Sequence, residues 1–202
     1  MDSHINKANW AILFSLALLV LFLDYSGLDM ALQKFFYDYE AAKFIGRDQF
    51  FFDQILHRGI KNLMYFLGVL SILLGAWAAK KKLITVGEVM VGIWGVLLIP
   101  LIVAFIKWFT EKQCPWSLTD FGGIEQHKHF WDFSLNHTIG QCFPAGHAAG
   151  GFMWLAWAVA LSKSYPRVSN GFFYFGLLTG FLMGFSRMMQ GAHFLSHVLA
   201  TL

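Results

Sequence analysis

Charged residues and cysteines are both scarce in this sequence. Only 13% of its 202 residues are charged, its formal net charge is +3, and it has two cysteines. So few charges exclude an ordinary soluble domain. The weak net charge, and the lack of a basic stretch interleaved with aromatic residues, argue against binding to nucleic acid. Two cysteines and no third allow one disulfide bond.

The sequence is rich instead in apolar and aromatic residues. Hydrophobic residues make up 57% of the chain, which contains 22 phenylalanines and eight tryptophans, and this composition suits a bilayer and its interfaces. We predict an all-α membrane protein, a bundle of five to six transmembrane helices in one domain over residues 1–202. The apolar runs place these helices at residues 10–23, 62–79, 84–106, 146–161 and 171–185, with a sixth opening at His193.

The first and the last of these predicted helices are short. The first apolar run is followed directly by Asp24 and Tyr25 and not by a small-residue cleavage site, so we interpret it as a retained membrane anchor. From His193 to Leu202 only ten residues remain, which amount to about 15 Å of helix, half of a bilayer core. Either the sixth helix ends midway or the sequence belongs to a longer chain.

Residues 29–61 mix aromatic clusters with charges. Aromatic triplets at 35–37 and 50–52 alternate with acidic and basic side chains. This pattern favours an amphipathic segment that lies on the membrane surface. A folded loop that caps the helices explains the pattern equally well.

Basic residues predict the orientation of the chain in the membrane. Lysines at 80–82 follow the predicted second helix, and Lys163 and Arg167 follow the fourth. Short cytoplasmic loops carry an excess of Lys and Arg, so these two loops are placed in the cytoplasm. Residues 29–61 and the long polar loop 108–146 then lie on the outer face.

Two short motifs near the C-terminal end contain candidate catalytic groups. One reads Pro144-Ala145-Gly146-His147, and the other has Ser186-Arg187, then His193 after five residues and His197 after three more. Ionisable residues on a membrane-embedded frame are costly and usually mark a site. His can act as nucleophile or as acid, and Arg pairs with phosphate in a fork. Two histidines, His147 and His193, together with Arg187 and Lys107 suggest phosphoryl transfer through a phosphohistidine.

At these motifs the chain resembles the type 2 phosphatidic acid phosphatases, the PAP2 superfamily of integral membrane lipid phosphatases. That family has the motifs Lys-x6-Arg-Pro, Pro-Ser-Gly-His and Ser-Arg-x5-His-x3-Asp. Here the first motif reads Lys107, six residues, then Cys114-Pro115, and the order and internal spacing of all three motifs hold. Three positions depart from the family: Cys114 replaces an arginine, Ala145 replaces a serine, and His197 replaces the terminal aspartate.

The resemblance implies a role for each of the retained residues. His193 would attack phosphorus and form a phosphohistidine, and His147 would protonate the leaving alkoxide and then activate water. Lys107 and Arg187 would bind the phosphoryl oxygens and stabilise their transition-state charge. Taken singly, the histidines could instead bond to backbone groups, and the two cations could be snorkelling side chains at helix ends.

The substituted positions leave alternatives open. Gly146 would let the backbone approach phosphate closely, and Ala145 would keep an amide there but lose a hydroxyl. His197 shares a helix face with His193 but brings no negative charge, so activity is reduced or another acid serves. A His-x3-His pair is also metal-ligand spacing, yet the family needs no metal and we predict none. The candidates for the other acid are Asp120, Glu125 and Asp132.

The resemblance therefore predicts a phosphatase that acts on a lipid phosphate monoester or pyrophosphate at the outer face of a bacterial inner membrane, without a cofactor. Family substrates include phosphatidic acid, phosphatidylglycerol phosphate, undecaprenyl pyrophosphate and lipid A phosphates, and the sequence does not choose among them or fix an oligomeric state. A lipid-to-lipid phosphotransferase and a non-catalytic protein that binds phospholipid head groups are the alternatives. The loop histidines His127, His129 and His137 decorate a solvated loop or contact the lipid head group.

The two cysteines fall in the loop that is placed outside. Cys114 belongs to the first motif, and Cys142 lies 28 residues further on, just before the second. Disulfides persist in a periplasmic compartment, so we predict a bond that holds Lys107 near His147. Closing a loop of this length is worth about 3–4 kcal/mol. Two buried, unpaired thiols are the alternative.

Overall fold

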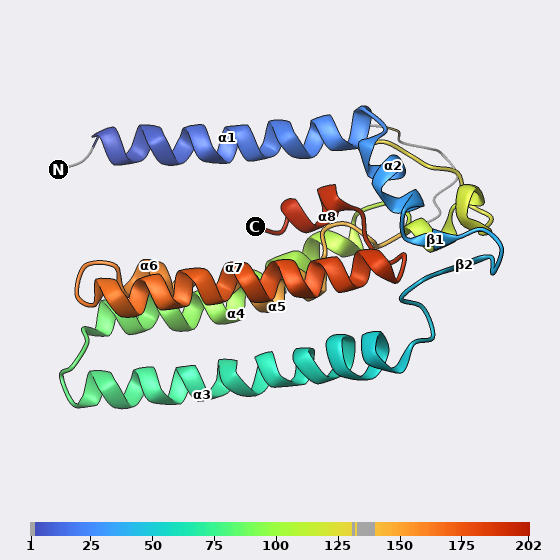
Figure 1. The fold of residues 1–202 in the computed structure, drawn as a ribbon. Helices are drawn as coiled ribbons and strands as arrows, with labels where there is room; N and C mark the ends of the chain where they lie inside the picture. The colour runs from blue at the N-terminus through green and yellow to red at the C-terminus, as the bar shows by residue number, and fades with distance from the viewer. Residues whose placement is uncertain (1–2, 131, 133–139) are drawn as a thin grey trace.

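The computed structural model describes residues 3–130, 132 and 140–202, and most of these residues are helical (Figure 1). A small antiparallel hairpin, β1–β2, accompanies the helices. In chain order the elements are α1 Ser3–Tyr25, α2 Leu28–Lys34, β1 Tyr37–Asp38, β2 Lys43–Phe44, the π-helix η1 Phe51–Gly59, α3 Ile60–Lys80, α4 Val86–Trp108, the 3-10 helices η2 Pro115–Ser117 and η3 Thr119–Phe121, α5 Gly146–Phe152, α6 Leu155–Leu161, α7 Pro166–Met189 and α8 Leu195–Leu199.

Several of the helices are long enough to cross a membrane. Among the described residues three helices pass by length and hydropathy, Phe51–Lys80, Val86–Trp108 and Pro166–Met189. A fourth span is present if α1 and α2, which meet at a bend of 66°, form one broken span, and Gly146–Leu161 is a shorter apolar pair. The prediction of an all-α, multi-pass membrane protein is confirmed.

Several predicted helix ends were wrong, and the first helix begins at Ser3 rather than at residue 10. The predicted helix at 62–79 begins at Phe51, because η1 runs directly into α3. The predicted helix at 171–185 begins at Pro166, since proline suits the first turn of a helix, where its missing N–H would have no partner. His193 does not open the last helix: Phe194 is extended, with φ −83° and ψ 166°, and α8 starts after it. The predicted helix at 146–161 is interrupted between α5 and α6.

A cluster of apolar side chains joins α3, α4, α6 and α7. Its centre is Trp157, whose ring lies so close to Gly92 that a Cβ there would stand 2.5 Å from it. The indole N–H of Trp157 donates to Ser71 Oγ at 3.1 Å, so its polar atom is satisfied inside the bundle. Large apolar side chains such as Phe14, Leu101 and Phe105 are exposed, as lipid-facing residues are in a membrane protein.

The two basic loops lie together at one end of the bundle. Thr85 and Glu88 form a capping box at the start of α4, where an acidic side chain is favourable. The Ser164 hydroxyl donates to Glu88, and the Tyr165 hydroxyl donates to Leu83 O at 2.6 Å. These bonds tie the loop after α3 to the loop after α6.

The opposite end of the bundle is covered by α2, the hairpin and the 115–121 segment (Figure 1). Tyr37 and Phe44 of the hairpin pack with Leu118, Phe121 and Phe194 in a buried aromatic cluster. The hairpin therefore caps the helices, which favours the second of the two interpretations for residues 29–61. Through Phe194, this aromatic cluster contacts the connection between α7 and α8.

Candidate active site

Four motif residues come together at the capped end of the bundle. Lys107 lies in the last turn of α4, His147 in the first turn of α5, Arg187 in the last turn of α7, and His193 in the α7–α8 connection. The Nζ atom of Lys107 would lie 3.9 Å from a Cβ placed on Gly146. The structure thus brings residues from all three motifs to one end of the bundle.

His193 is buried and has one well-defined hydrogen-bond partner. Its Nδ1 atom lies 2.9 Å from the carbonyl oxygen of Cys142, and its side chain is only 3% exposed. A carbonyl can only accept a hydrogen bond, so Nδ1 must carry the proton. In the neutral ring the lone pair is then on Nε2, the nitrogen that is free to act as a nucleophile.

The surroundings of His193 keep its ring neutral. Burial is the main cause that lowers the pKa of His193 well below its ordinary value, and the charges of His197 and Lys107 act in the same direction. Arg187 and His147 add smaller effects of the same sign. The four motif residues are thus close enough to influence one another, and the His193 imidazole is held in its nucleophilic, uncharged form.

The predicted disulfide is present. Cys114 and Cys142 are bonded, with Cα atoms 5.2 Å apart. Next to the bond, the Cys142 N–H donates to Lys112 O at 3.1 Å and the Thr110 hydroxyl donates to Phe143 O at 2.7 Å. The segment after Lys107 is therefore fastened to the segment that holds the carbonyl partner of His193.

Ala145 has a different contact from the one expected. It is fully buried, and its N–H donates to His197 O at 3.0 Å and lies 3.0 Å from the hydroxyl oxygen of Thr201. Its amide is engaged inside the protein, and the phosphate-binding role given to Ala145 stays a prediction. The bond instead joins the second motif to α8, which leaves Gly146 as the position beside Lys107.

His197 packs among aromatic rings. It is fully buried, with ring centroids 5.5 Å from Phe143, 5.2 Å from Phe194 and 5.9 Å from His193. No group of three or more His, Cys, Asp or Glu side chains that could hold a metal is found in the part of the chain that the structure describes. The place of the family aspartate is therefore a packed histidine, and the partner of His193 Nδ1 is the Cys142 carbonyl.

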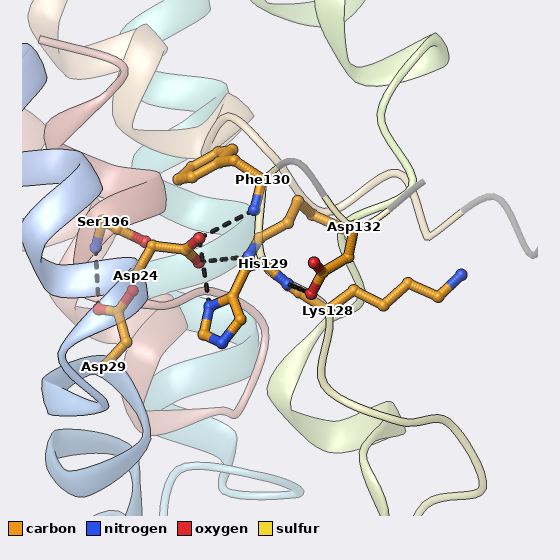
Figure 2. Close-up of polar contacts among 8 residues, drawn as sticks. Asp24, Asp29, Lys128, His129, Phe130, Asp132 and Ser196 are labelled. Carbon is orange, nitrogen blue, oxygen red and sulfur yellow. Dashed lines mark hydrogen bonds and ion pairs between the residues drawn. The ribbon is translucent and has the colours of Figure 1, made fainter. Parts of the chain in front are cut away.

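The acids nearest to α8 come from the N-terminal part of the chain (Figure 2). Asp29 accepts a hydrogen bond from the Ser196 N–H at 3.1 Å, in the first turn of α8. Asp24 accepts from the Phe130 N–H at 2.9 Å and pairs with Lys112. Both carboxylates are buried; Asp29 fastens the α1–α2 corner to α8, and Asp24 fastens this corner to the long loop at Lys112 and Phe130.

The three acids proposed from the sequence lie in the long polar loop between α4 and α5. Asp132 accepts from the His129 N–H at 2.7 Å (Figure 2), and Asp120 is exposed in η3. Glu125 continues the loop, where its N–H donates to Ser117 O at 2.8 Å. The sequence signal that points to Asp24 is an acid placed directly after an apolar run, where a charge is costly.

His57 is a further residue that sequence reasoning missed. Its ring centroid lies 4.3 Å from that of His147, and its Nδ1 atom is 3.3 Å from Asp53 Oδ1. Asp53 and His57 both belong to η1, where their spacing of four residues places them on one face of the helix. Lys61, one turn further, lines a cavity of about 300 Å³ together with Lys107, Gly146 and His147. The Asp-x3-His spacing was the available signal.

The loop histidines are not all solvated. His127 packs edge-on against Phe194, with centroids 5.7 Å apart, and burial lowers its pKa to about 4, aided by the charge of Lys112. His129 stacks on Tyr25 at 4.7 Å. The prediction of a solvated side chain is wrong for His127, whereas His129 remains partly exposed, and His137 lies outside the described residues.

Comparison with known proteins agrees with the arrangement of these motifs. The PAP2 superfamily model matches residues 88–202, more than half of the chain and all three motifs. The chain belongs to the PAP2 superfamily. A search of curated proteins finds no match. The crystal structure of the first transmembrane PAP2 type phosphatidylglycerolphosphate phosphatase from Bacillus subtilis is similar, with 22% identity and a TM-score of 0.57 over 93% of this chain and 87% of that one.

The similarity to the Bacillus protein shows that the two chains share a fold. Membership of the PAP2 superfamily supports a lipid phosphatase function for this multi-pass membrane protein. The match places Lys107, His147, Arg187 and His193 inside the family region, while their individual roles remain predictions.

Proposed function

We propose that this protein hydrolyses a phosphate monoester or pyrophosphate of a membrane lipid through a phosphohistidine on His193. The observation that carries the proposal is the hydrogen bond from His193 Nδ1 to Cys142 O at 2.9 Å. It fixes the tautomer whose Nε2 lone pair can attack phosphorus. Burial then keeps this imidazole unprotonated.

The proposed reaction has two steps. His193 Nε2 forms a bond to phosphorus while the phosphorus–oxygen bond to the lipid breaks, and His147, in its imidazolium form, gives one proton to the departing oxygen and becomes neutral. Water then attacks phosphorus, His147 takes one of its protons, and the nitrogen–phosphorus bond breaks to release phosphate. Lys107 and Arg187 bind the phosphoryl oxygens in both steps, where charge-assisted hydrogen bonds are strongest. His57, held by Asp53, packs against His147 and orients its ring.

The active face is proposed to lie on the periplasmic side of a bacterial inner membrane. The charge bias that places the 80–82 loop in the cytoplasm supports this orientation, because the candidate residues lie at the other end of the bundle (Figure 1). A cysteine introduced at Lys81 and one introduced at Asp120 should differ in labelling by a membrane-impermeant maleimide on intact cells. Labelling of both positions, or of Lys81→Cys alone, contradicts the orientation.

The activity is tested by phosphate release from a panel of lipid phosphates. Purified protein is given phosphatidic acid, phosphatidylglycerol phosphate, undecaprenyl pyrophosphate and a lipid A phosphate, with and without an acceptor lipid. We expect release from at least one of them and a loss of at least about a thousandfold for His193→Ala, because the third motif offers no other nucleophile at this spacing. Turnover within tenfold of the parent protein in a folded His193→Ala variant defeats the mechanism. Transfer only to the acceptor identifies a phosphotransferase, and binding without turnover identifies a head-group-binding protein.

A further inference from the structure

The first motif lacks its arginine, and the side chain at that position is used for something else. Where the family has arginine, Cys114 is buried and bonded to Cys142. Trp116 follows two residues later, and its backbone N–H donates a hydrogen bond to Gly191 O at 2.9 Å. Trp116 therefore lies against the connection that carries His193.

Two guanidinium groups lie over the Trp116 ring. Arg187 is 5.5 Å from the ring centroid and Arg47 is 5.7 Å from it. Arg187 belongs to the third motif, whereas Arg47 comes from the segment between β2 and η1. The fold thus places a second arginine against Trp116, two residues after the position at which the first motif has lost its arginine.

The backbone around Arg47 is held against α7. The Gly46 N–H donates to Met189 O at 2.9 Å, and a Cβ on Gly46 would stand 2.9 Å from the same oxygen. A side chain at this position would push the segment away from α7. Since Met189 ends the helix that carries Arg187, this contact sets the position of Arg47 relative to Arg187.

Both arginines line one cavity of about 490 Å³, together with Trp116 and Gln190. Arg187 donates to Gln190 Oε1, while its buried Nε has no hydrogen-bond partner among the described residues. The carboxylates of Asp48 and Asp53 also line the cavity.

These carboxylates do not neutralise Arg47. Asp53 is paired with His57 and Arg58, at 3.3 Å in each case. In the described part of the chain Arg47 makes no ion pair with a carboxylate. Its guanidinium donors are therefore available to an anion in the cavity.

We propose that Arg47 binds the phosphate of the lipid substrate together with Arg187, in place of the arginine that the family has at the position of Cys114. The proposal extends the phosphatase function proposed above and assigns a role to a residue outside the three motifs. A guanidinium suits this task because it offers paired donors to two phosphoryl oxygens. Trp116 holds both guanidinium groups by cation–π contact.

The test is direct binding of inorganic phosphate, measured by calorimetry on the full chain in detergent, beside KM and kcat for the best lipid substrate. Arg47→Gln should raise the dissociation constant for phosphate by about tenfold or more. Arg47→Lys keeps the charge but loses the fork, so its effect should be intermediate. Lys43→Gln is the matched control: it makes the same change of charge at an exposed site of the neighbouring strand β2, and phosphate binding should not change.

Each outcome decides the proposal. Unchanged phosphate affinity in Arg47→Gln overturns it, and so does a fall in melting temperature alone, which would show that Arg47 only packs on Trp116. An equal loss in Lys43→Gln also overturns it, because the effect would then be one of general charge. If phosphate binding depends on Arg47 but the parent protein releases no phosphate from any lipid, the binding role stands and the phosphatase function fails. Arg47→Lys provides the answer if Arg47→Gln does not fold.

Discussion

Removal of the Cys114–Cys142 disulfide should reduce both stability and turnover. The bond closes a loop with a sequence separation of 28 residues, which the chain-entropy relation values at about 3–4 kcal/mol. For a chain of this size each kcal/mol corresponds to about 2–4 °C in melting temperature. We therefore expect the melting temperature of the reduced protein to fall by about 10 °C.

The expected effect on turnover follows from the partner of His193. The Cys142 carbonyl fixes the His193 tautomer at 2.9 Å, and a single neutral hydrogen bond contributes about 0.5–1.5 kcal/mol. Loss of its fixed position should lower kcat by about two- to tenfold. KM should change little, because Lys107 and Arg187 are placed by α4 and α7 and not by the loop.

The assay compares phosphate release and thermal melting before and after treatment with a mild reductant, with the thiol state established by alkylation and mass spectrometry. The double variant Cys114→Ser with Cys142→Ser is the control, since it should resemble the reduced protein and be insensitive to reductant. Fully alkylated protein that keeps the parent's kcat and melting temperature refutes the reasoning. A lower melting temperature with unchanged kcat refutes only the link between the disulfide and His193.

Three other perturbations test separate parts of the site. His147→Gln should slow turnover by about 10²–10⁴-fold and leave an alkali-stable phosphoryl label on the protein, and unchanged release would exclude its acid–base role. Asp29→Ala should destabilise the fold by about 1–3 kcal/mol because the Ser196 N–H loses its acceptor; Asp29→Asn, which keeps an acceptor oxygen, should retain most of that stability in a melting experiment. The pKa of His127 is about 4 in the folded protein and about 6.5 in an unfolded chain, so stability should fall as the pH drops from 6.5 towards 4. An equally steep acid dependence in His127→Phe would show that another group is responsible.

The sequence predicted the membrane helices, because these depend on local patterns. Apolar runs identify membrane helices, and positions at helix ends place Lys107, Arg187 and the start of α5 at one end of the bundle. The cysteine pair was also predictable, because both residues fall in one loop. Helix ends were less predictable: Pro166 begins α7 and η1 extends α3, where turn and propensity signals compete with the apolar pattern.

The contacts of the supporting residues could not be predicted, since these contacts join distant parts of the chain. Arg47, His57 and Asp29 all lie in or near the mixed segment 29–61, for which the sequence allowed either a surface segment or a cap. Only the packing of the hairpin against Phe194 shows that this segment covers the site. The spacing of residues along the sequence does not predict contacts between distant segments. The structure is therefore needed to identify which polar side chains lie near the site.

Two of the three departures from the family motifs are linked in the structure. The cysteine that replaces the arginine of the first motif bonds to Cys142, and the carbonyl of Cys142 accepts the hydrogen bond from His193 Nδ1. The histidine at the position of the family aspartate is packed among aromatic rings and leaves this acceptor role to the carbonyl. A carbonyl orients the ring as an aspartate does but adds no negative charge. If His193 is the nucleophile, its positive charge in the transition state is therefore less stabilised than beside an aspartate. Catalysis then depends more strongly on Lys107 and Arg187, the cations proposed to bind the phosphate.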